Sequence, residues 1–379
     1  MRIHVVTLAG RLLASLDTDT AWTRRQLCRH IPGLAGPALR AARFFHGGAE
    51  ISDETPLCCL DVHDGANLLL VFDARKNLEV VTASRDRTAK LWSVESAACR
   101  RTLVNGHTDG VTRATFSLDG TSVITASSDR TAQLWCAESG ERRGRPQGLG
   151  DGVASLAFSS DGSLVATASP DGAAILWCTR SGSSLRSLQG HAGRVTSVAF
   201  SPDSLSVVTA SSDGAARLWN AQSGECVRTL AGHGAGVTAA AFSPDGALVV
   251  TASLDRTARL WDATSGEHIR TLQGDVGIVY SVAFSPDGGL VVTASANRTA
   301  TLWSADSGEC LRSFEGHKDS VMSAAFSPDG EFVVTASLDH TARLWSVESG
   351  ECVSTLQGHS GPVYSAAFSP PIVLAATLL

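Results

Sequence analysis

The chain has 379 residues and a formal net charge of −6 at neutral pH, so it suits one large repeat domain or two domains and carries no basic signature for binding nucleic acid. Nine cysteines are scattered without zinc spacing, so we expect reduced thiols, no metal and no cofactor. The chain shows no signal peptide and no membrane-length apolar run, so we expect a soluble protein of the cytoplasm, with the nucleus as a second possibility.

Residues 1–74 contain no repeat and read as a small mixed domain. Apolar and polar residues alternate over residues 1–7, a turn follows at 8–10, and alternation resumes over 12–16, which predicts a hairpin. A helix is expected from about Trp22 to Ile31, with Pro32 and Gly33 to end it. Two more strands are expected near residues 43–48 and 67–72.

This order of strand, strand, helix, strand, strand is a β-grasp. It resembles ubiquitin over about residues 1–72, through Met1-x-Ile3-x-Val5-x-Thr7-Leu8-x-Gly10 and Phe44-Phe45-x-Gly47-Gly48. The resemblance implies a docking patch at Leu8, Phe45, Leu69 and Val71. The alternative is that some of these residues are core, because any β-grasp strand alternates in this way. The domain runs straight into the repeats without a free terminal glycine pair, so we expect no transferable tag.

Beyond residue 75 the chain is periodic. Seven Leu-Trp pairs recur, and after one 43-residue step every interval is 42, which is typical of a repeat architecture. Their tryptophans are Trp92, Trp135, Trp177, Trp219, Trp261, Trp303 and Trp345. One unit contains His233, Phe242-Ser243-Pro244-Asp245-Gly246, Asp255 and Leu260-Trp261, an order that closely resembles the WD40 repeat. The resemblance implies that each unit supplies four antiparallel strands to a propeller blade.

The count of strand types predicts how the ring closes. Second, third and outer strands number seven, whereas first strands begin only at Val111 and the seventh is residues 363–368. We therefore predict a propeller over residues 75–371, closed when the strand at 363–368 joins the blade begun near Leu78. Residues 372–379 are expected to form an apolar tail. The predicted fold class is mainly β, a seven-bladed WD40 propeller preceded by an α+β ubiquitin-like β-grasp domain at 1–74.

The resemblance also implies a buried hydrogen-bonded set in each blade, made of His, Thr, Asp and Trp. The complete sets are His359, Thr82, Asp86 and Trp92; His107, Thr125, Asp129 and Trp135; His191, Thr209, Asp213 and Trp219; His233, Thr251, Asp255 and Trp261; and His317, Thr335, Asp339 and Trp345. Leu149 stands at the His position of the third blade, and Asp275 and Asn297 replace His and Asp in the sixth. These two blades should be the softest.

Thr, His and Asp are also the residue types of a nucleophile, a base and its orienting partner. Repetition of the set in nearly every blade favours a structural role, because an active site is normally built once per fold. The sequence has no phosphate-binding loop and no nucleophile elbow. We therefore expect no catalytic residues and no enzymatic activity.

In the WD40 family, the loops before first strands and the turns after second strands crowd one face, which commonly receives peptides. Residues at these positions vary here while the framework does not, which indicates a recognition surface, although drift on solvated loops explains the variation nearly as well. The predicted binding residues are Arg85, Ser128, Arg194, Leu254, Ile278, Lys318 and Leu338. Because these residues include both aliphatic and basic side chains, they fit a peptide that has apolar and acidic side chains.

These features predict a non-enzymatic, monomeric scaffold. Its propeller would hold a client protein or peptide, and its ubiquitin-like domain would dock on a receptor of the ubiquitin pathway. The alternative is a WD40 sensor or regulatory module of a signalling complex, in which the N-terminal domain is only structural. A third possibility, an enzyme that uses the central channel, requires perturbed acids or bases clustered in one blade, and the sequence offers none.

Overall fold

The computed structural model describes residues 78–117, 119–144, 155–169, 171–274 and 277–370, together with five strands before residue 73. The chain divides into two compact units, Met1–Leu78 with Pro371–Leu379, and Glu79–Pro370. The expected helix at 22–31, the tail at 372–379 and the residues Leu8, Leu149 and Asp275 lie outside the described residues. Within the described residues, no helix has the length and apolar character needed to cross a membrane.

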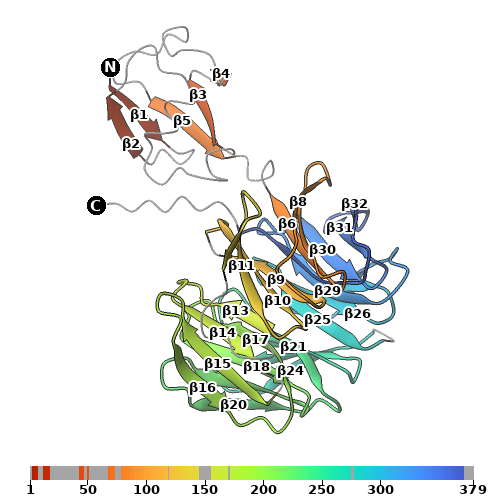
Figure 1. Ribbon diagram of the computed structural model, residues 1–379. Coiled ribbons are helices and arrows are strands. Elements are labelled where there is room, and N and C mark those ends of the chain that lie inside the picture. Colours follow the sequence, from red (N-terminus) through yellow and green to blue (C-terminus); the bar gives the residue numbers. More distant parts are fainter. Residues whose placement is uncertain are drawn as a thin grey trace. The chain divides into compact units, whose positions relative to one another are not determined.

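The first unit contains one five-stranded sheet (Figure 1). Its strands are β1 (Arg2–Val6), β2 (Leu12–Asp17), β3 (Ala42–His46), β4 (Ala49–Glu50) and β5 (Asn67–Phe72). They lie in the order β2-β1-β5-β3-β4, with β1 parallel to β5 and the other pairs antiparallel. The hairpin and the two later strands expected from the sequence are present in this sheet.

The second unit is a seven-bladed propeller of four-stranded antiparallel sheets, as the sequence predicts (Figure 1). Blade 1 is built from β33 (Val363–Phe368), β6 (Glu79–Ser84), β7 (Ala89–Ser93) and β8 (Cys99–Leu103). Blade 2 contains β9 (Val111–Phe116), β10 (Ser122–Ser127), β11 (Ala132–Cys136) and β12 (Arg142–Gly144). Blade 3 contains β13 (Ser155–Phe158), β14 (Leu164–Ala168), β15 (Ala173–Cys178) and β16 (Ser184–Gln189).

The other four blades repeat this order from first strand to outer strand. Blade 4 contains β17 (Val195–Phe200), β18 (Ser206–Ser211), β19 (Ala215–Asn220) and β20 (Cys226–Ala231). Blade 5 contains β21 (Val237–Phe242), β22 (Leu248–Ser253), β23 (Ala258–Asp262) and β24 (His268–Leu272). Blade 6 contains β25 (Val279–Phe284), β26 (Leu290–Ser295), β27 (Ala300–Ser304) and β28 (Cys310–Phe314). Blade 7 contains β29 (Val321–Phe326), β30 (Phe332–Ser337), β31 (Thr341–Ser346) and β32 (Cys352–Gln357).

Blade 1 is assembled from both ends of the repeat region. β33 pairs antiparallel with β6, with Phe368 opposite Val80 and Ala366 opposite Thr82. The Ser369 N–H also donates to the Glu79 carbonyl at 2.8 Å. The expected closure of the ring is therefore confirmed, and the last strand covers an edge of β6 that would otherwise be open to other chains.

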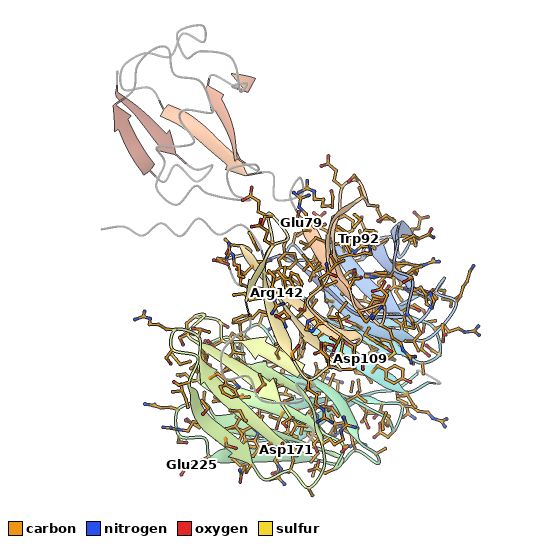
Figure 2. All side chains as sticks on the ribbon, in the orientation of Figure 1. Glu79, Trp92, Asp109, Arg142, Asp171 and Glu225 are labelled. Carbon is orange, nitrogen blue, oxygen red and sulfur yellow. The ribbon has the colours of Figure 1, made fainter. Side chains whose placement is uncertain are left out.

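The strands differ in burial because they occupy different places in a blade. The second strand of blade 5 is buried from Val249 to Ser253, since sheets of the neighbouring blades cover both of its faces. Its outer strand is exposed from His268 to Arg270, and only Leu272 is buried. Charged side chains such as that of Glu225 lie at the surface (Figure 2).

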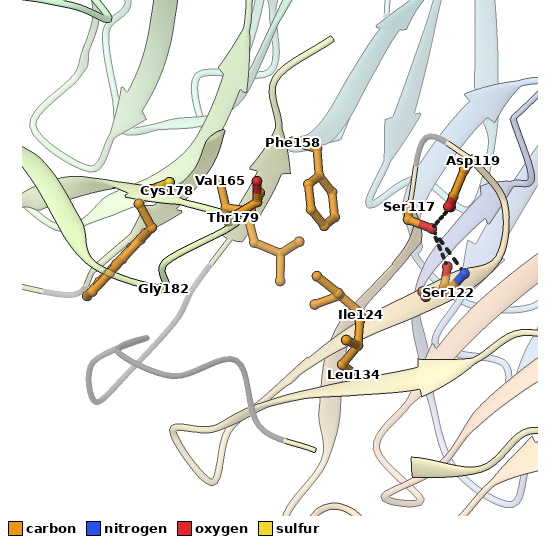
Figure 3. A pocket seen from close by; sticks show the side chains of 12 residues that line it. Ser117, Asp119, Ser122, Ile124, Leu134, Phe158, Val165, Cys178, Thr179 and Gly182 are labelled. Carbon is orange, nitrogen blue, oxygen red and sulfur yellow. Dashed lines mark hydrogen bonds between the residues drawn. The ribbon is translucent and has the colours of Figure 1, made fainter. Parts of the chain in front are cut away.

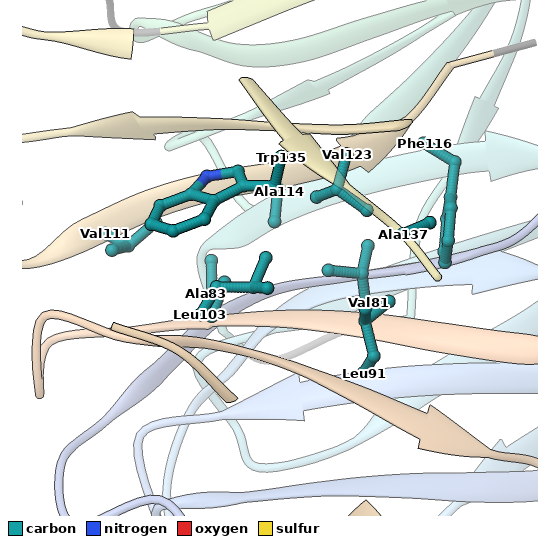
Figure 4. Packing of buried hydrophobic residues seen from close by; sticks show 11 residues of the cluster. Val81, Ala83, Leu91, Leu103, Val111, Ala114, Phe116, Val123, Trp135 and Ala137 are labelled. Carbon is teal, nitrogen blue, oxygen red and sulfur yellow. The ribbon is translucent and has the colours of Figure 1, made fainter. Parts of the chain in front are cut away.

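The core consists of apolar clusters between neighbouring blades. At the junction of blades 1 and 2, Val81, Leu91 and Leu103 pack against Val123 and Trp135 (Figure 4). A buried tryptophan removes about 150–250 Å² from water. Replacing such a residue by alanine costs about 3–5 kcal/mol, so each tryptophan is a main attachment point between two blades.

Candidate functional site

In five blades the expected polar residues form one continuous chain of hydrogen bonds. In blade 4, Trp219 Nε1–H donates to Thr209 Oγ1 at 2.8 Å, and Thr209 Oγ1 lies 2.7 Å from His191 Nε2. His191 Nδ1 lies 2.8 Å from Asp213 Oδ2. The same three links occur in blades 1, 2, 5 and 7.

The charge states follow from burial. Burial lowers the pKa of His191, His233 and His359 despite the opposing effect of the neighbouring carboxylates, so these imidazoles are neutral at neutral pH. An ionised carboxylate only accepts, so each His Nδ1 carries the proton and its Nε2 accepts from the threonine hydroxyl. The threonine oxygen in turn accepts from the indole, and every member of the set has a partner.

The aspartate of each set also joins two chain segments. Asp255 Oδ1 accepts from the Thr257 N–H at 3.0 Å and Oδ2 accepts from the Gly234 N–H at 2.9 Å. Burial alone would raise the pKa of Asp255, but hydrogen bonds from Thr257, His233 and Gly234 together lower it to about 2. Asp255 accepts hydrogen bonds from both segments, and Thr251 is completely buried, so these residues hold the strands and loops of the blade together.

Within the described residues, blades 3 and 6 retain the tryptophan and the threonine of this set. Trp177 Nε1–H donates to Thr167 Oγ1, and Trp303 Nε1–H donates to Thr293 Oγ1, both at 2.9 Å. In blade 6, Asn297 Oδ1 accepts from the Thr299 N–H at 3.0 Å, so the amide replaces the carboxylate in the turn. The expected softness of these blades stays a prediction.

One side of the propeller, here called the loop face, carries the loops before first strands and the turns after second strands. A backbone hydrogen bond of 2.9–3.0 Å joins the two in six blades. The donor is the N–H of the residue before the turn aspartate, or before Asn297 in blade 6, and the acceptor is the carbonyl of the residue before the first strand. The pairs are Arg85 with Pro362, Ser128 with Gly110, Ser212 with Arg194, Leu254 with Gly236, Ala296 with Ile278, and Leu338 with Ser320. The predicted binding residues in the turns after second strands therefore lie beside those in the loops before first strands.

Most of the predicted binding residues are accessible. Arg85, Ser128, Arg194, Leu254 and Lys318 are exposed, whereas Ile278 and Leu338 are half-buried. Lys318 lies at the start of its loop, where its N–H donates to Asp339 Oδ2 at 2.9 Å. The loop-face residues of neighbouring blades are also in contact. A Cβ on Gly236 of blade 5 would lie 3.1 Å from Ser212 Cα of blade 4.

The sequence analysis missed a second group of loop-face residues. Four arginines and one histidine have positive φ, from 66° in Arg130 to 73° in Arg298. All five are exposed, and they are Arg87, Arg130, Arg256, Arg298 and His340. The left-handed region costs a side-chain-bearing residue roughly 1–2 kcal/mol. Blades 3 and 4 have Gly172 and Gly214 there. Comparison of Asp-Arg-Thr with Asp-Gly-Ala in the sequence could have revealed them, because glycine is the residue that this backbone favours.

The sequence profile of the family described as WD domain, G-beta repeat, matches residues 97–136, 145–178, 182–220, 224–262, 266–304, 308–346 and 350–371. The chain belongs to the WD40 repeat family. No curated protein matches it. Each WD40 repeat is shared by two blades, since the match at 224–262 spans β20 of blade 4 and β21 to β23 of blade 5. WD40 propellers are generally scaffolds for protein interaction and typically lack catalytic activity.

Proposed function

We propose that this WD40 protein is a non-enzymatic scaffold whose loop face binds a segment of a client protein that combines acidic and apolar side chains. The observation that carries the proposal is the set of exposed basic residues on that face, including Arg85, Arg194 and the four arginines held with positive φ. Backbone strain kept at an exposed position is a feature of functional surfaces.

The apolar part of the client would contact the aliphatic residues between these cations. Leu254 is 43% exposed, and Ile278 and Leu338 retain partial exposure. Each exposed charge pair contributes only about 0–1 kcal/mol, so affinity requires several arginines together with buried apolar contacts. The charges would act mainly on the association rate and on the choice of partner.

We further propose that the N-terminal unit is a ubiquitin-like domain that docks on a receptor of ubiquitin-pathway signals. The sheet order β2-β1-β5-β3-β4, with β1 parallel to β5, supports a β-grasp. In the register of β3 with β5, Phe45 is opposite Leu69, and Val71 is two positions along the same strand. Three of the four predicted patch residues therefore occupy neighbouring register positions.

The client site is tested by affinity capture with the full chain. An Arg85→Glu/Arg194→Glu variant should lose the client, because it places acidic groups opposite an acidic segment. The matched control, Arg142→Glu/Arg180→Glu, makes the same charge change at exposed positions on the other side of the propeller. Equal recovery of the same proteins by both variants would refute the loop-face proposal.

The docking role is tested by the same capture with Phe45→Asp in the full chain. Loss of ubiquitin-pathway components, with the propeller client retained, is the expected result. Unchanged partners in this variant would instead favour the alternative function, a sensor or regulatory module whose N-terminal domain is only structural.

A further inference from the structure

One position of the first strand recurs in all seven blades, opposite an alanine of the second strand. In blade 4 it is Ser197, which lies opposite Ala210. Six blades have serine or alanine at this position, and the residues are Ser365, Ser155, Ser197, Ala239, Ser281 and Ser323. Blade 2 has Arg113, opposite Ala126. Among the described residues of the seven first strands, Arg113 is the one charged residue.

Arg113 lies on the inner side of the ring, in the part of its strand nearer the loop face. First strands of neighbouring blades, such as β17 and β21, lie side by side around the axis of the propeller (Figure 1). β9 begins at the loop face, where the Gly110 carbonyl accepts from the Ser128 N–H, and Arg113 is in the first half of that strand. Ala114 and Phe116 pack into the cluster between blades 1 and 2, so strand alternation directs Arg113 to the opposite face.

The guanidinium of Arg113 has no hydrogen bond or ion pair with the residues that the structure describes. The side chain is half-buried, and burial lowers its pKa without an opposing effect from any described acidic group. The group nevertheless stays charged at neutral pH, as arginine does in proteins. By contrast, Arg100 of blade 1 pairs with Glu79 at 2.8 Å. A desolvated charge without a partner destabilises a fold, and proteins keep such features chiefly at functional sites.

A single guanidinium among uncharged first strands fits one carboxylate. The fork of an arginine side chain can donate two parallel N–H···O bonds to the two oxygens of a carboxylate, and one cation balances one such anion. A phosphate group carries nearly two negative charges at neutral pH. It would leave charge unbalanced, because the matching positions of the other blades hold serine or alanine.

The position directly before Arg113 in the repeat brings larger side chains to the same inner side. In blade 4 this residue is Thr196, whose Oγ1 donates to the Val237 carbonyl of the next blade at 2.7 Å, so the position lies between neighbouring first strands. Three consecutive blades have Tyr280, Met322 and Tyr364 here, and all three are half-buried. The inner side therefore has apolar surface on blades 6, 7 and 1 and a cation on blade 2.

We propose that Arg113 is a specificity residue for the client and pairs with one carboxylate of the client segment at the centre of the loop face. This assignment rests on the proposed function and adds where the acidic side chain goes, which is toward the axis and β9. Arg85 and Arg194 are exposed, so solvent weakens their ion pairs. Arg113 is desolvated, so it selects an acidic residue at one fixed position of the segment.

The test selects peptides from a random library with the full chain and three variants. The wild type should enrich one acidic position flanked by apolar residues, and Arg113→Ser should lose the acidic position but keep the apolar ones. Arg113→Ser places in blade 2 the residue type of the neighbouring blades, so it should fold. Arg113→Lys should retain the acidic preference with weaker binding, because it keeps the charge without the fork. Arg142→Ser, at an exposed position of β12, is the matched control and should select like the wild type.

A selected peptide and the same peptide with its acidic residue changed to the amide complete a double-mutant cycle. The amide should weaken binding to the wild type about tenfold or more and leave binding to Arg113→Ser nearly unchanged. Without peptide, Arg113→Ser should unfold at a higher urea concentration than the wild type, because it removes an unpartnered charge. An arginine with a purely structural role would give the opposite shift.

Three outcomes overturn the assignment of Arg113. They are an acidic position that persists with Arg113→Ser, an equal effect of the amide on both proteins, and a lower urea midpoint for Arg113→Ser. Each of these leaves the loop face as the client site. Wild-type peptides without an acidic residue would instead contradict the proposed function together with this assignment.

Discussion

His359 Nε2 lies 2.7 Å from Thr82 Oγ1, although the two residues are 277 positions apart in the chain. Trp92 Nε1–H donates to the same threonine at 2.8 Å, and Asp86 Oδ2 lies 2.8 Å from His359 Nδ1. The last repeat therefore supplies blade 1 with a strand and with one member of its polar set. The segment that closes the ring therefore also completes the buried hydrogen-bond network of blade 1.

Thr82→Val should destabilise the propeller by about 2–4 kcal/mol, because the indole of Trp92 and the imidazole of His359 each lose a buried partner. Urea unfolding measures the change. Thr102→Val is the matched control, since Thr102 is exposed and its hydroxyl is bonded to the Lys90 ammonium and the Cys99 thiol at the surface. Equal losses in the two variants would show that the buried chain of hydrogen bonds contributes nothing specific.

A chain that ends at residue 362 keeps His359 but lacks β33, and we expect it to aggregate and to lose cooperative unfolding. The reason is that β6 then presents an unpaired edge. A chain that ends at Pro370 retains the strand and should unfold like the full propeller. Light scattering and denaturant unfolding of the two truncations decide the matter, and a soluble, cooperative protein ending at 362 would be incompatible with the closure.

The sequence was sufficient to predict the propeller because the repeat period and the strand count leave one way to close the ring. The polar sets were predicted from the resemblance to the WD40 repeat, which implies the set and so assigned its members in each unit. The apolar pocket of about 280 Å³ between blades 2 and 3 could not be predicted in this way (Figure 3). Gly144 stands where five blades have arginine, and Thr179 stands where six blades have alanine or valine. The effect of these departures on packing appears only when residues of adjacent blades face one another.

The propeller should lose stability as pH falls. Burial lowers the pKa of His191, His233 and His359 below 6.5, so their contribution is present above pH 6.5 and declines as pH falls from there toward their folded values. The pKa of Asp129 and Asp255 falls from 3.8 to about 2, so a second loss occurs between these pH values. Urea unfolding at pH 8, 6.5 and 5 tests the first window, and equal or greater stability at pH 5 would contradict it.

Blade 3 should exchange its backbone amides with solvent faster than blade 5. Its polar set lacks histidine in the sequence, and Trp177 is the most exposed tryptophan of the repeats. Blade 2 also has Gly144 at the position where five other blades have an arginine that donates to a backbone carbonyl of the next blade. Hydrogen exchange mass spectrometry of β14 and β15 against β22 and β23 measures the difference. Blade 6 should fall between them, because Asn297 preserves its turn. Equal protection in all three blades would contradict the reasoning.

The most direct test of the central claim is to select binding peptides from a random library with the full chain and to map each by photo-crosslinking. We predict sequences that combine acidic and apolar residues, with crosslinks at Arg85, Arg194, Leu254 and the turn arginines of the loop face. Crosslinks confined to the opposite side or to the outer strands, or peptides without acidic residues, would contradict the assignment of the loop face as the client site.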